Sequence, residues 1–165
     1  MNDLEIYKIL INIELANCIE KIKKTSLTRD VVFLCVGNSK VWYDSFGPMM
    51  GSLLQFFGVK NYVYGNIRSN IHKDNIHEYI KIINKFHYNP YIVVFDNAFS
   101  NNDEFGIKIM EDGVECAAFS NDPAYVGDLS ILCLTPCQFI KENRHYADML
   151  GEIKKLAFYF KELYL

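Results

Sequence analysis

The sequence predicts an α/β fold with three layers, α/β/α, in which a mostly parallel sheet lies between helices. Two runs are apolar almost throughout, Asp30–Gly37 (DVVFLCVG) and Tyr91–Asp96 (YIVVFD), and helical periodicity separates them. Such runs are typical of strands buried on both faces, as in parallel sheets covered by helices. Parallel strands also need a long crossover connection, which is usually a helix. The two runs are therefore expected to be parallel strands of one sheet.

Length and composition fit a single domain over residues 1–165. Half of the residues are hydrophobic, which is enough for one substantial core, and no repeat or linker divides the chain. No apolar run approaches the roughly 18 residues that cross a bilayer, and the N-terminus has acidic residues without an apolar leader. We therefore expect an intracellular protein without a membrane partner.

The N-terminal residues 3–23 are expected to form a helix that covers one face of the sheet. The predicted buried stripe, at helical spacing, is Ile6, Ile9, Leu10, Ile13 and Ala16. After the first strand, residues 47–57 predict a second helix, stopped by Gly58. Its inward residues are expected to be Met50, Leu53, Leu54 and Phe57.

A short strand over residues 62–64 and a third helix over residues 74–86 complete the connection to the later strand. The helix has apolar residues at helical spacing, namely Ile76, Tyr79, Ile80 and Ile83. Farther on, residues 105–110, 115–119 and 126–134 predict further strands in the least regular part of the chain.

The C-terminal part predicts a last helix. Thr135 fits an N-cap, Pro136 a first-turn residue and Gln138 a capping-box partner. An apolar stripe with three-four spacing then runs from Tyr146 to Leu163. The helix is therefore expected to begin near Thr135 and to reach the end of the chain, with Asn143 as a candidate break within it.

The cysteines predict reduced thiols in the core. They form an odd set scattered through apolar segments, which does not suit a disulfide framework. The five are Cys18, Cys35, Cys116, Cys133 and Cys137. Cys133 and Cys137 alone lack the second half of a zinc site. We expect no metal and no other cofactor, and a cytoplasmic location.

The charge distribution argues against nucleic acid as a partner. The formal net charge is −3, and the 17 basic residues are dispersed, whereas binding to nucleic acid needs a basic patch. Aromatic residues fall within hydrophobic periodicities, so they fit core or interface positions better than base stacking.

Two aspartates are the best candidates for chemistry. Asp44 follows the first strand by a short loop, and Asp96 is expected to end the later strand. Loops at the carboxyl ends of parallel strands converge, and ligands bind there. If the strands are neighbours, the two carboxyls can share a water molecule and one proton, which suits general acid-base chemistry. Asp44, near a helix N-terminus, is expected to be the anion, and desolvation favours Asp96 as the proton carrier.

The same aspartates also have an ordinary structural interpretation. Aspartate before a helix is a common N-cap, and aspartate after a strand is a common turn residue. Other sites are disfavoured, since the loop GNSKVWYDSFGP lacks both phosphate-binding glycine patterns and Cys35 forms no readable triad with the four histidines. The patterns alone leave both interpretations of Asp44 and Asp96 open.

Four segments occur in a recognisable order over about residues 30–150, namely FLCVGNSKVWYDSFGPMMG, VYGNIRSNIHKDNI, NPYIVVFDNAF and VGDLSI. They resemble the YyaC-type sporulation proteins, relatives of the spore germination protease within the fold of the hydrogenase-maturation endopeptidases. Residues 44–48 (DSFGP) match the family's D-S-L-G-P turn, residues 63–66 match V-Y-G-T, and residues 96–99 loosely match D-A-C-L.

The resemblance implies a phosphorylase/hydrolase-like fold, with Asp44 and Asp96 on positions that resemble the two catalytic aspartates of the germination protease. Neighbouring residues of these loops are expected to contact the substrate, namely Asn38, Ser45, Gly47 and Asn97. The chain departs from the family pattern in three places, where Trp42 and Tyr43 replace small residues and Ser100 replaces glycine. These changes are expected to narrow the entrance and to alter the loop that receives a peptide.

Three functions fit these residues. The leading hypothesis is a sporulation-associated peptidase with an aspartate-activated water, and the resemblance implies small acid-soluble spore proteins as substrates, in the cytoplasm or the developing spore. A second is a catalytically impaired protein of sporulation that binds a peptide or partner. A third, a metal-dependent maturation peptidase, needs a histidine that faces both carboxylates, and none follows Asp96 at a matching position. An oligomer is possible.

Overall fold

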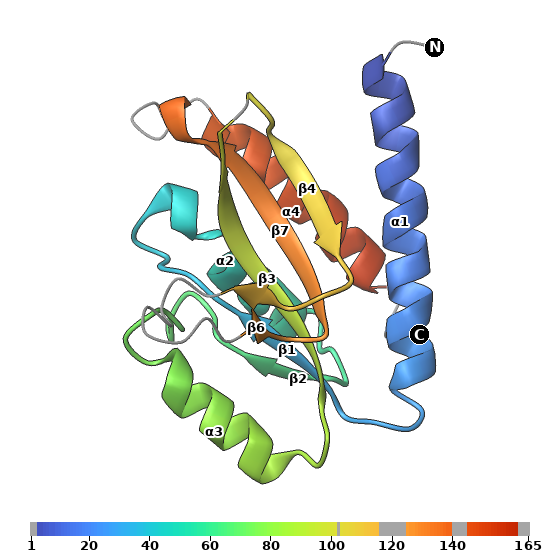
Figure 1. The fold of residues 1–165 in the computed structure, drawn as a ribbon, viewed down its shortest axis with the longest axis vertical. Coiled ribbons are helices and arrows are strands. Elements are labelled where there is room, and N and C mark those ends of the chain that lie inside the picture. Colours follow the sequence, from blue (N-terminus) through green and yellow to red (C-terminus); the bar gives the residue numbers. More distant parts are fainter. Residues whose placement is uncertain (1–2, 102, 116–124, 140–144, 162–165) are drawn as a thin grey trace.

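A computed structural model describes residues 3–101, 103–115, 125–139 and 145–161 (Figure 1). Its five-stranded sheet has the order β2-β1-β3-β7-β4, and among these strands only β4 is antiparallel to its neighbour. The strands are β1 Val31–Cys35, β2 Tyr62–Tyr64, β3 Tyr91–Ser100, β4 Gly106–Met110 and β7 Leu129–Pro136. Two short strands, β5 Val114–Glu115 and β6 Tyr125–Val126, form a separate antiparallel pair. The prediction that these two strands lie parallel in one sheet is confirmed, and β1 pairs directly with β3.

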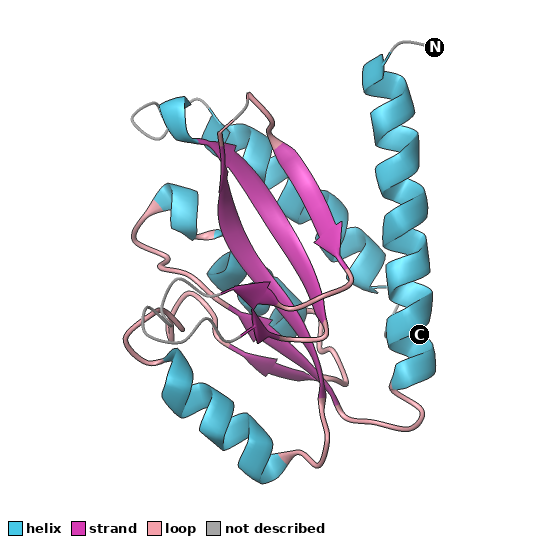
Figure 2. Cartoon of the chain, in the orientation of Figure 1, coloured by secondary structure: helices cyan, strands magenta, loops and turns pink. Residues whose placement is uncertain are grey.

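Helices cover both faces of the sheet (Figure 2). They are α1 Asp3–Thr25, α2 Phe46–Phe56, α3 Ile76–Phe86 and α4 Tyr146–Lys161. Phe33 and Phe95 point toward α2 and α4, whereas Leu34 and Val94 point toward α3, so each face has its own buried cluster. The predicted α/β fold with a mostly parallel sheet between helices is therefore confirmed.

The face that α1 buries differs from the prediction. The predicted stripe is exposed to solvent, at Ile6, Ile9, Leu10, Ile13 and Ala16. The buried residues are instead Ile11, Leu15, Cys18, Ile19 and Ile22, most of them at three-four spacing on another side of the helix. Helix α1 has two apolar stripes, and the packing of its second half against α4 and β4 decides which one is buried.

Three further predictions need correction. Strand β3 does not end at Asp96 but continues to Ser100, paired with β7 along this extension. Thr135 and Pro136 are the last residues of β7 and not the start of a helix, because they pair with β3; a 3₁₀ turn, η2 Cys137–Phe139, follows. The helix that carries the C-terminal apolar stripe begins only at Tyr146.

The cysteine prediction holds for part of the set. Cys18, Cys35 and Cys133 are buried free thiols, whereas Cys137 is exposed. Cys116, like most of the predicted strand 115–119, lies outside the described residues. Burial raises the pKa of the Cys18 and Cys133 thiols to about 12, so these groups stay protonated and inert at neutral pH.

Candidate functional site

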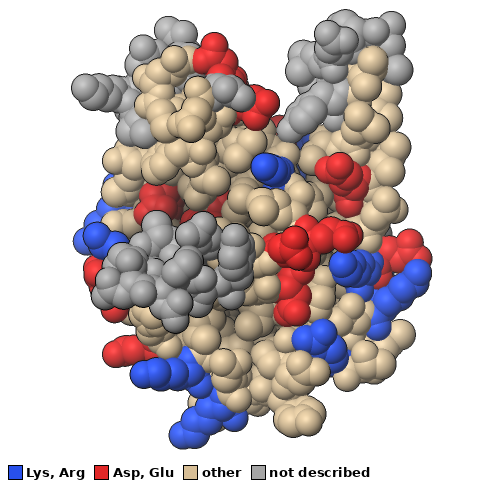
Figure 3. All heavy atoms as spheres, viewed as in Figure 1, with Lys and Arg blue, Asp and Glu red and all other residues tan. Residues whose placement is uncertain are grey.

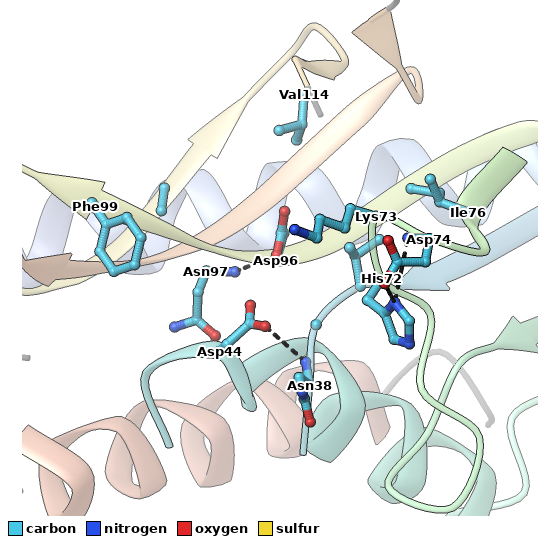
Figure 4. A pocket seen from close by; sticks show the side chains of 13 residues that line it. Asn38, Asp44, His72, Lys73, Asp74, Ile76, Asp96, Asn97, Phe99 and Val114 are labelled. Atoms are coloured by element: carbon cyan, nitrogen blue, oxygen red, sulfur yellow. Dashed lines mark hydrogen bonds and ion pairs between the residues drawn. The ribbon is translucent and has the colours of Figure 1, made fainter. Parts of the chain in front are cut away.

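The carboxyl ends of β1 and β3 bring Asp44 and Asp96 together (Figure 4). Asp44 ends the 3₁₀ turn η1 Trp42–Asp44, between β1 and α2, and Asp96 lies within β3. Gly47 lets α2 start directly against both strands, since a Cβ atom there would lie 2.0 Å from the Val36 carbonyl oxygen and 2.6 Å from that of Phe95. The close approach of the α2 N-terminus holds the Asp44 loop beside β3.

Asp44 is held across its own loop and does not cap α2. Its Oδ2 accepts a hydrogen bond from the Asn38 backbone N–H at 3.0 Å, and its backbone carbonyl accepts a second one from the same N–H at 2.8 Å. The N-cap of α2 is Ser45, whose hydroxyl donates to the Trp42 carbonyl at 2.8 Å. The ordinary interpretation of Asp44 as a helix cap is therefore not what the structure shows.

Asp96 is a strand residue with an elevated pKa. Desolvation, followed by the negative charge of Asp44, raises the pKa of this carboxyl to about 8, although the Asn97 N–H that donates to its Oδ1 at 2.8 Å opposes the shift. Desolvation also raises the pKa of Asp44, against the Asn38 N–H and the nearby His72. Asp96 therefore keeps its proton at neutral pH, and the pKa of Asp44 is shifted in the same direction by the loss of solvent.

A cavity of about 670 Å³ contains both carboxyls. Its other side is formed by His72, Lys73 and Asp74, from the loop between β2 and α3 (Figure 4). Figure 4 shows the Lys73 side chain extending toward Asp96. The cavity therefore combines the acid pair with a histidine, a lysine and a further aspartate from a third loop.

Asparagine side chains fix the loop that carries these groups. Asn66 Oδ1 accepts from the backbone N–H groups of Arg68 and Ser69, both at 2.8 Å, and Asn75 Oδ1 accepts from that of His72 at 2.8 Å. The sequence argument did not single out His72, Lys73 or Asp74. The signal was present, because this polar loop follows the parallel strand β2 and so belongs to the same edge of the sheet.

The four residues predicted to contact substrate fall into two groups. Asn38 and Asn97 line the cavity, whereas Ser45 and Gly47 are buried and do not line it. The Asn97 side chain also has a structural contact, since its Oδ1 accepts from the Phe46 N–H at 3.0 Å. Contact with substrate remains a prediction for all four residues.

Aromatic rings lie next to the acid pair. The Tyr43 ring is 6.0 Å from that of Phe99 and 5.7 Å from that of Trp42, measured between centroids. Phe99 lines the cavity and keeps 55% of its surface exposed. The bulky residues at 42 and 43 thus belong to an aromatic border of the site.

The described residues contain neither a cluster of metal ligands nor a membrane-spanning helix. No three His, Cys, Asp or Glu side chains converge there in a way that could hold a metal ion. None of the described helices is both long and apolar enough to span a membrane. On the face shown in Figure 3, acidic and basic side chains of the described residues are interspersed.

Comparison with known proteins identifies the family. The model of the family described as "protein of unknown function (DUF1256)" matches residues 1–154. The chain belongs to this family. It is also 30% identical over 106 residues to "uncharacterized protein YyaC" of Bacillus subtilis (strain 168). The match covers 62% of this chain and 52% of YyaC, so the chain spans about half the length of that relative.

The fold of this DUF1256 member is similar to that of a maturation protease. The crystal structure of a [NiFe] hydrogenase maturation protease, HycI from Thermococcus kodakarensis KOD1, matches with a TM-score of 0.51 and 14% identity, over 86% of this chain and 97% of HycI. An uncharacterized protein from Wolinella succinogenes matches with a TM-score of 0.41 and 14% identity, over 78% of this chain and 96% of that protein. The predicted resemblance to YyaC-type proteins and to the hydrogenase-maturation endopeptidase fold is confirmed.

Proposed function

We propose that this protein is a peptidase of sporulation that hydrolyses a peptide bond with a water molecule activated by Asp44. The observation that carries the proposal is the acid pair itself, in which two carboxyls line one cavity, both with raised pKa values and that of Asp96 raised to about 8. The protease fold of HycI supports it at the level of architecture. The resemblance to YyaC-type sporulation proteins makes small acid-soluble spore proteins the first substrates to test, and the developing spore a location to examine.

The proposed reaction uses each carboxyl twice. The Asp44 carboxylate takes a proton from water as the water oxygen attacks the peptide carbonyl carbon, and the Asp96 carboxylic acid donates its proton to the carbonyl oxygen. A neutral tetrahedral diol results. As the C–N bond breaks, Asp44 donates its proton to the leaving nitrogen, and Asp96 takes one proton from a diol hydroxyl. The pair returns to its starting state with the carboxylic acid and the amine released.

The test compares the wild type with Asp44→Asn and Asp96→Asn. Asparagine nearly keeps the size of aspartate but cannot exchange the proton, so each variant should lose about 10²- to 10⁴-fold in kcat/KM. The double variant should lose little more than either single one, because the two groups act as a unit. Cleavage of a spore-protein digest and of a peptide library is followed by mass spectrometry, with Asp112→Asn, an exposed aspartate, as the matched control.

Thermal unfolding of all variants is measured in parallel, so that lost folding is not read as lost catalysis. Equal cleavage by the wild type and both folded single variants would contradict the proposal. A second function, peptide binding without cleavage, is favoured by the aromatic border around Tyr43 and Phe99. Its signature would be a wild type that binds peptides of the library and cleaves none.

A further inference from the structure

Strand β3 continues past the end of its neighbour β1 beside the acid pair. The last register pair between them is Cys35 with Phe95, whereas β3 pairs with β7 as far as Ser100. The Val36 N–H donates to the Phe95 carbonyl at 2.8 Å, and the chain then turns away into the Asp44 loop. Among the described strands, none lies beside Asp96–Ser100 on the side that β1 has left.

The backbone of this extension presents hydrogen-bonding groups toward the acid pair. Backbone groups of a strand alternate between its two neighbours. Tyr91 and Phe95 bond toward β1, through the Tyr91 N–H to Asp30 and the Phe95 carbonyl to Val36. The same alternation directs the Asn97 carbonyl and the Phe99 N–H to the side without a strand. The Asn97 N–H, which also faces that side, is taken by the Asp96 carboxyl at 2.8 Å.

We propose that the substrate binds as an extended peptide that adds a strand to β3 along Asn97–Ser100, in the position that β1 leaves. One residue of the peptide donates its N–H to the Asn97 carbonyl and accepts from the Phe99 N–H, as in other peptides that bind to a sheet edge. This inference rests on the proposed function for the nature of the substrate. Asn97, Ala98 and Phe99 line the same cavity as Asp44 and Asp96, so a strand here brings its peptide bonds to the acid pair.

The two sides of this edge differ in the side chains they offer. Phe99 and Tyr43 lie together on the α2 side, and Phe99 is more than half exposed. The α3 side of the cavity carries His72, Lys73 and Asp74, and Lys73 extends toward Asp96 (Figure 4). Because side chains of a strand alternate between faces, the peptide should have a bulky apolar residue toward Phe99 and a polar or acidic neighbour toward Lys73.

The test measures binding to Asp44→Asn, in which hydrolysis is arrested, so that it does not depend on catalysis. A random-sequence decapeptide library is passed over the immobilised variant, and retained peptides are resynthesised with one backbone amide at a time N-methylated. A bound strand uses alternate N–H groups, so methylation should weaken binding about tenfold at one or more positions and little at the positions next to them.

Two substitutions at Phe99 separate the contribution of its backbone N–H to peptide binding from that of its ring. Phe99→Pro removes the N–H at this edge and leaves the register with β7 to Ala98 and Ser100, whereas Phe99→Ala keeps the N–H and removes the ring. In the Asp44→Asn background, the proline variant should lose about tenfold in affinity for every retained peptide. The alanine variant should lose the preference for a bulky apolar residue and keep the alternating N-methyl pattern.

The outcomes distinguish this inference from the proposed hydrolysis. An alternating N-methyl pattern without cleavage by the wild type supports strand binding and contradicts the peptidase. Cleavage by the wild type with no alternation keeps the peptidase and overturns strand binding. Strand binding is also overturned if no decapeptide is retained, or if a folded Phe99→Pro variant binds as well as its parent; the N-methyl scan decides alone if that variant does not fold.

Discussion

Two polar clusters lie at opposite ends of β1 and β3 and differ in how their groups are paired. At the amino ends, the buried His87 lies between Asp30 and Tyr64, at 2.9 Å from the carboxylate through Nδ1 and 3.0 Å from the hydroxyl through Nε2. Beyond the carboxyl end of β1, Asp44 and Asp96 line one cavity, and each carboxyl accepts a hydrogen bond from a backbone N–H.

The first cluster satisfies its groups internally. Because a carboxylate accepts, the tautomer that fits both contacts has its proton on Nδ1, toward Asp30, and accepts from the Tyr64 hydroxyl at Nε2. In the second cluster, desolvation, followed by the charge of Asp44, raises the pKa of Asp96 to about 8. A fully paired network stabilises a fold, whereas carboxyls with raised pKa values in an open cavity can exchange protons with a substrate or water.

The largest expected effect that sharpens this contrast is the pH dependence of peptide cleavage. Asp96 must keep its proton, so kcat/KM should fall about tenfold per pH unit above pH 8. Asp44 must be anionic, and since its pKa is raised above the usual range, activity should also fall at acid pH. The profile is measured with a cleaved peptide from pH 4 to 10, with Asp112→Asn as control. A flat profile between pH 6 and 10 would contradict the assignment of the acid to Asp96.

The sequence predicted the meeting of the two aspartates for a general reason. Apolar runs long enough to be buried on both faces predict parallel strands, and the carboxyl ends of adjacent parallel strands share one edge. Asp44 follows the first run by a loop and Asp96 ends the second run, so their proximity depends on β1 and β3 being neighbours, which they are. The sequence favours a surface or satisfied polar position for His72, and it does not place this residue at the same edge because β2, the strand before its loop, has only three residues.

Tertiary contacts determine the length of β3 and the buried face of α1, which local sequence patterns do not predict. The extension of β3 over Asn97–Ser100 depends on pairing with β7, whose last residues, Thr135 and Pro136, had the local pattern of a helix start. In α1 two apolar stripes compete, and the packing of Leu15 and Ile22 into the common core decides between them. Both cases follow from the rule that packing overrides local propensity.

A second prediction tests whether the His87 cluster, at the amino ends of β1 and β3, has a structural role only. His87→Ala removes a buried ring and leaves Tyr64 without its acceptor, so the free energy of unfolding should fall by about 2–4 kcal/mol. The kcat/KM of the folded fraction should stay unchanged, because this cluster is at the other end of the strands. Urea unfolding and peptide cleavage are measured together, with the exposed His77→Ala on α3 as control. A folded His87→Ala that cleaves much more slowly would place this cluster in the catalytic machinery.

The smallest expected effect concerns the stability of Asp96→Asn. Between the usual aspartate pKa of 3.8 and about 8, the folded protein keeps a proton on Asp96 that the unfolded chain has released. The free energy of unfolding of the wild type therefore falls as pH rises through this window and levels off above pH 8. Asparagine is neutral at every pH, and its Oδ1 still accepts from the Asn97 N–H, so the variant lacks this loss. The free energy of unfolding of Asp96→Asn should equal that of the wild type near pH 4 and be larger above pH 8, by on the order of 1 kcal/mol. The difference stays this small because solvent around the part-exposed carboxyl reduces the full effect.

Urea unfolding at pH 4, 6.5 and 9 measures this difference in the free energy of unfolding. Asp30→Asn is the contrasting variant, because loss of its bond to His87 should destabilise the protein at neutral pH. A difference between Asp96→Asn and wild type that is the same at all three pH values would show that Asp96 titrates as an ordinary aspartate and that the two carboxyls do not share a proton.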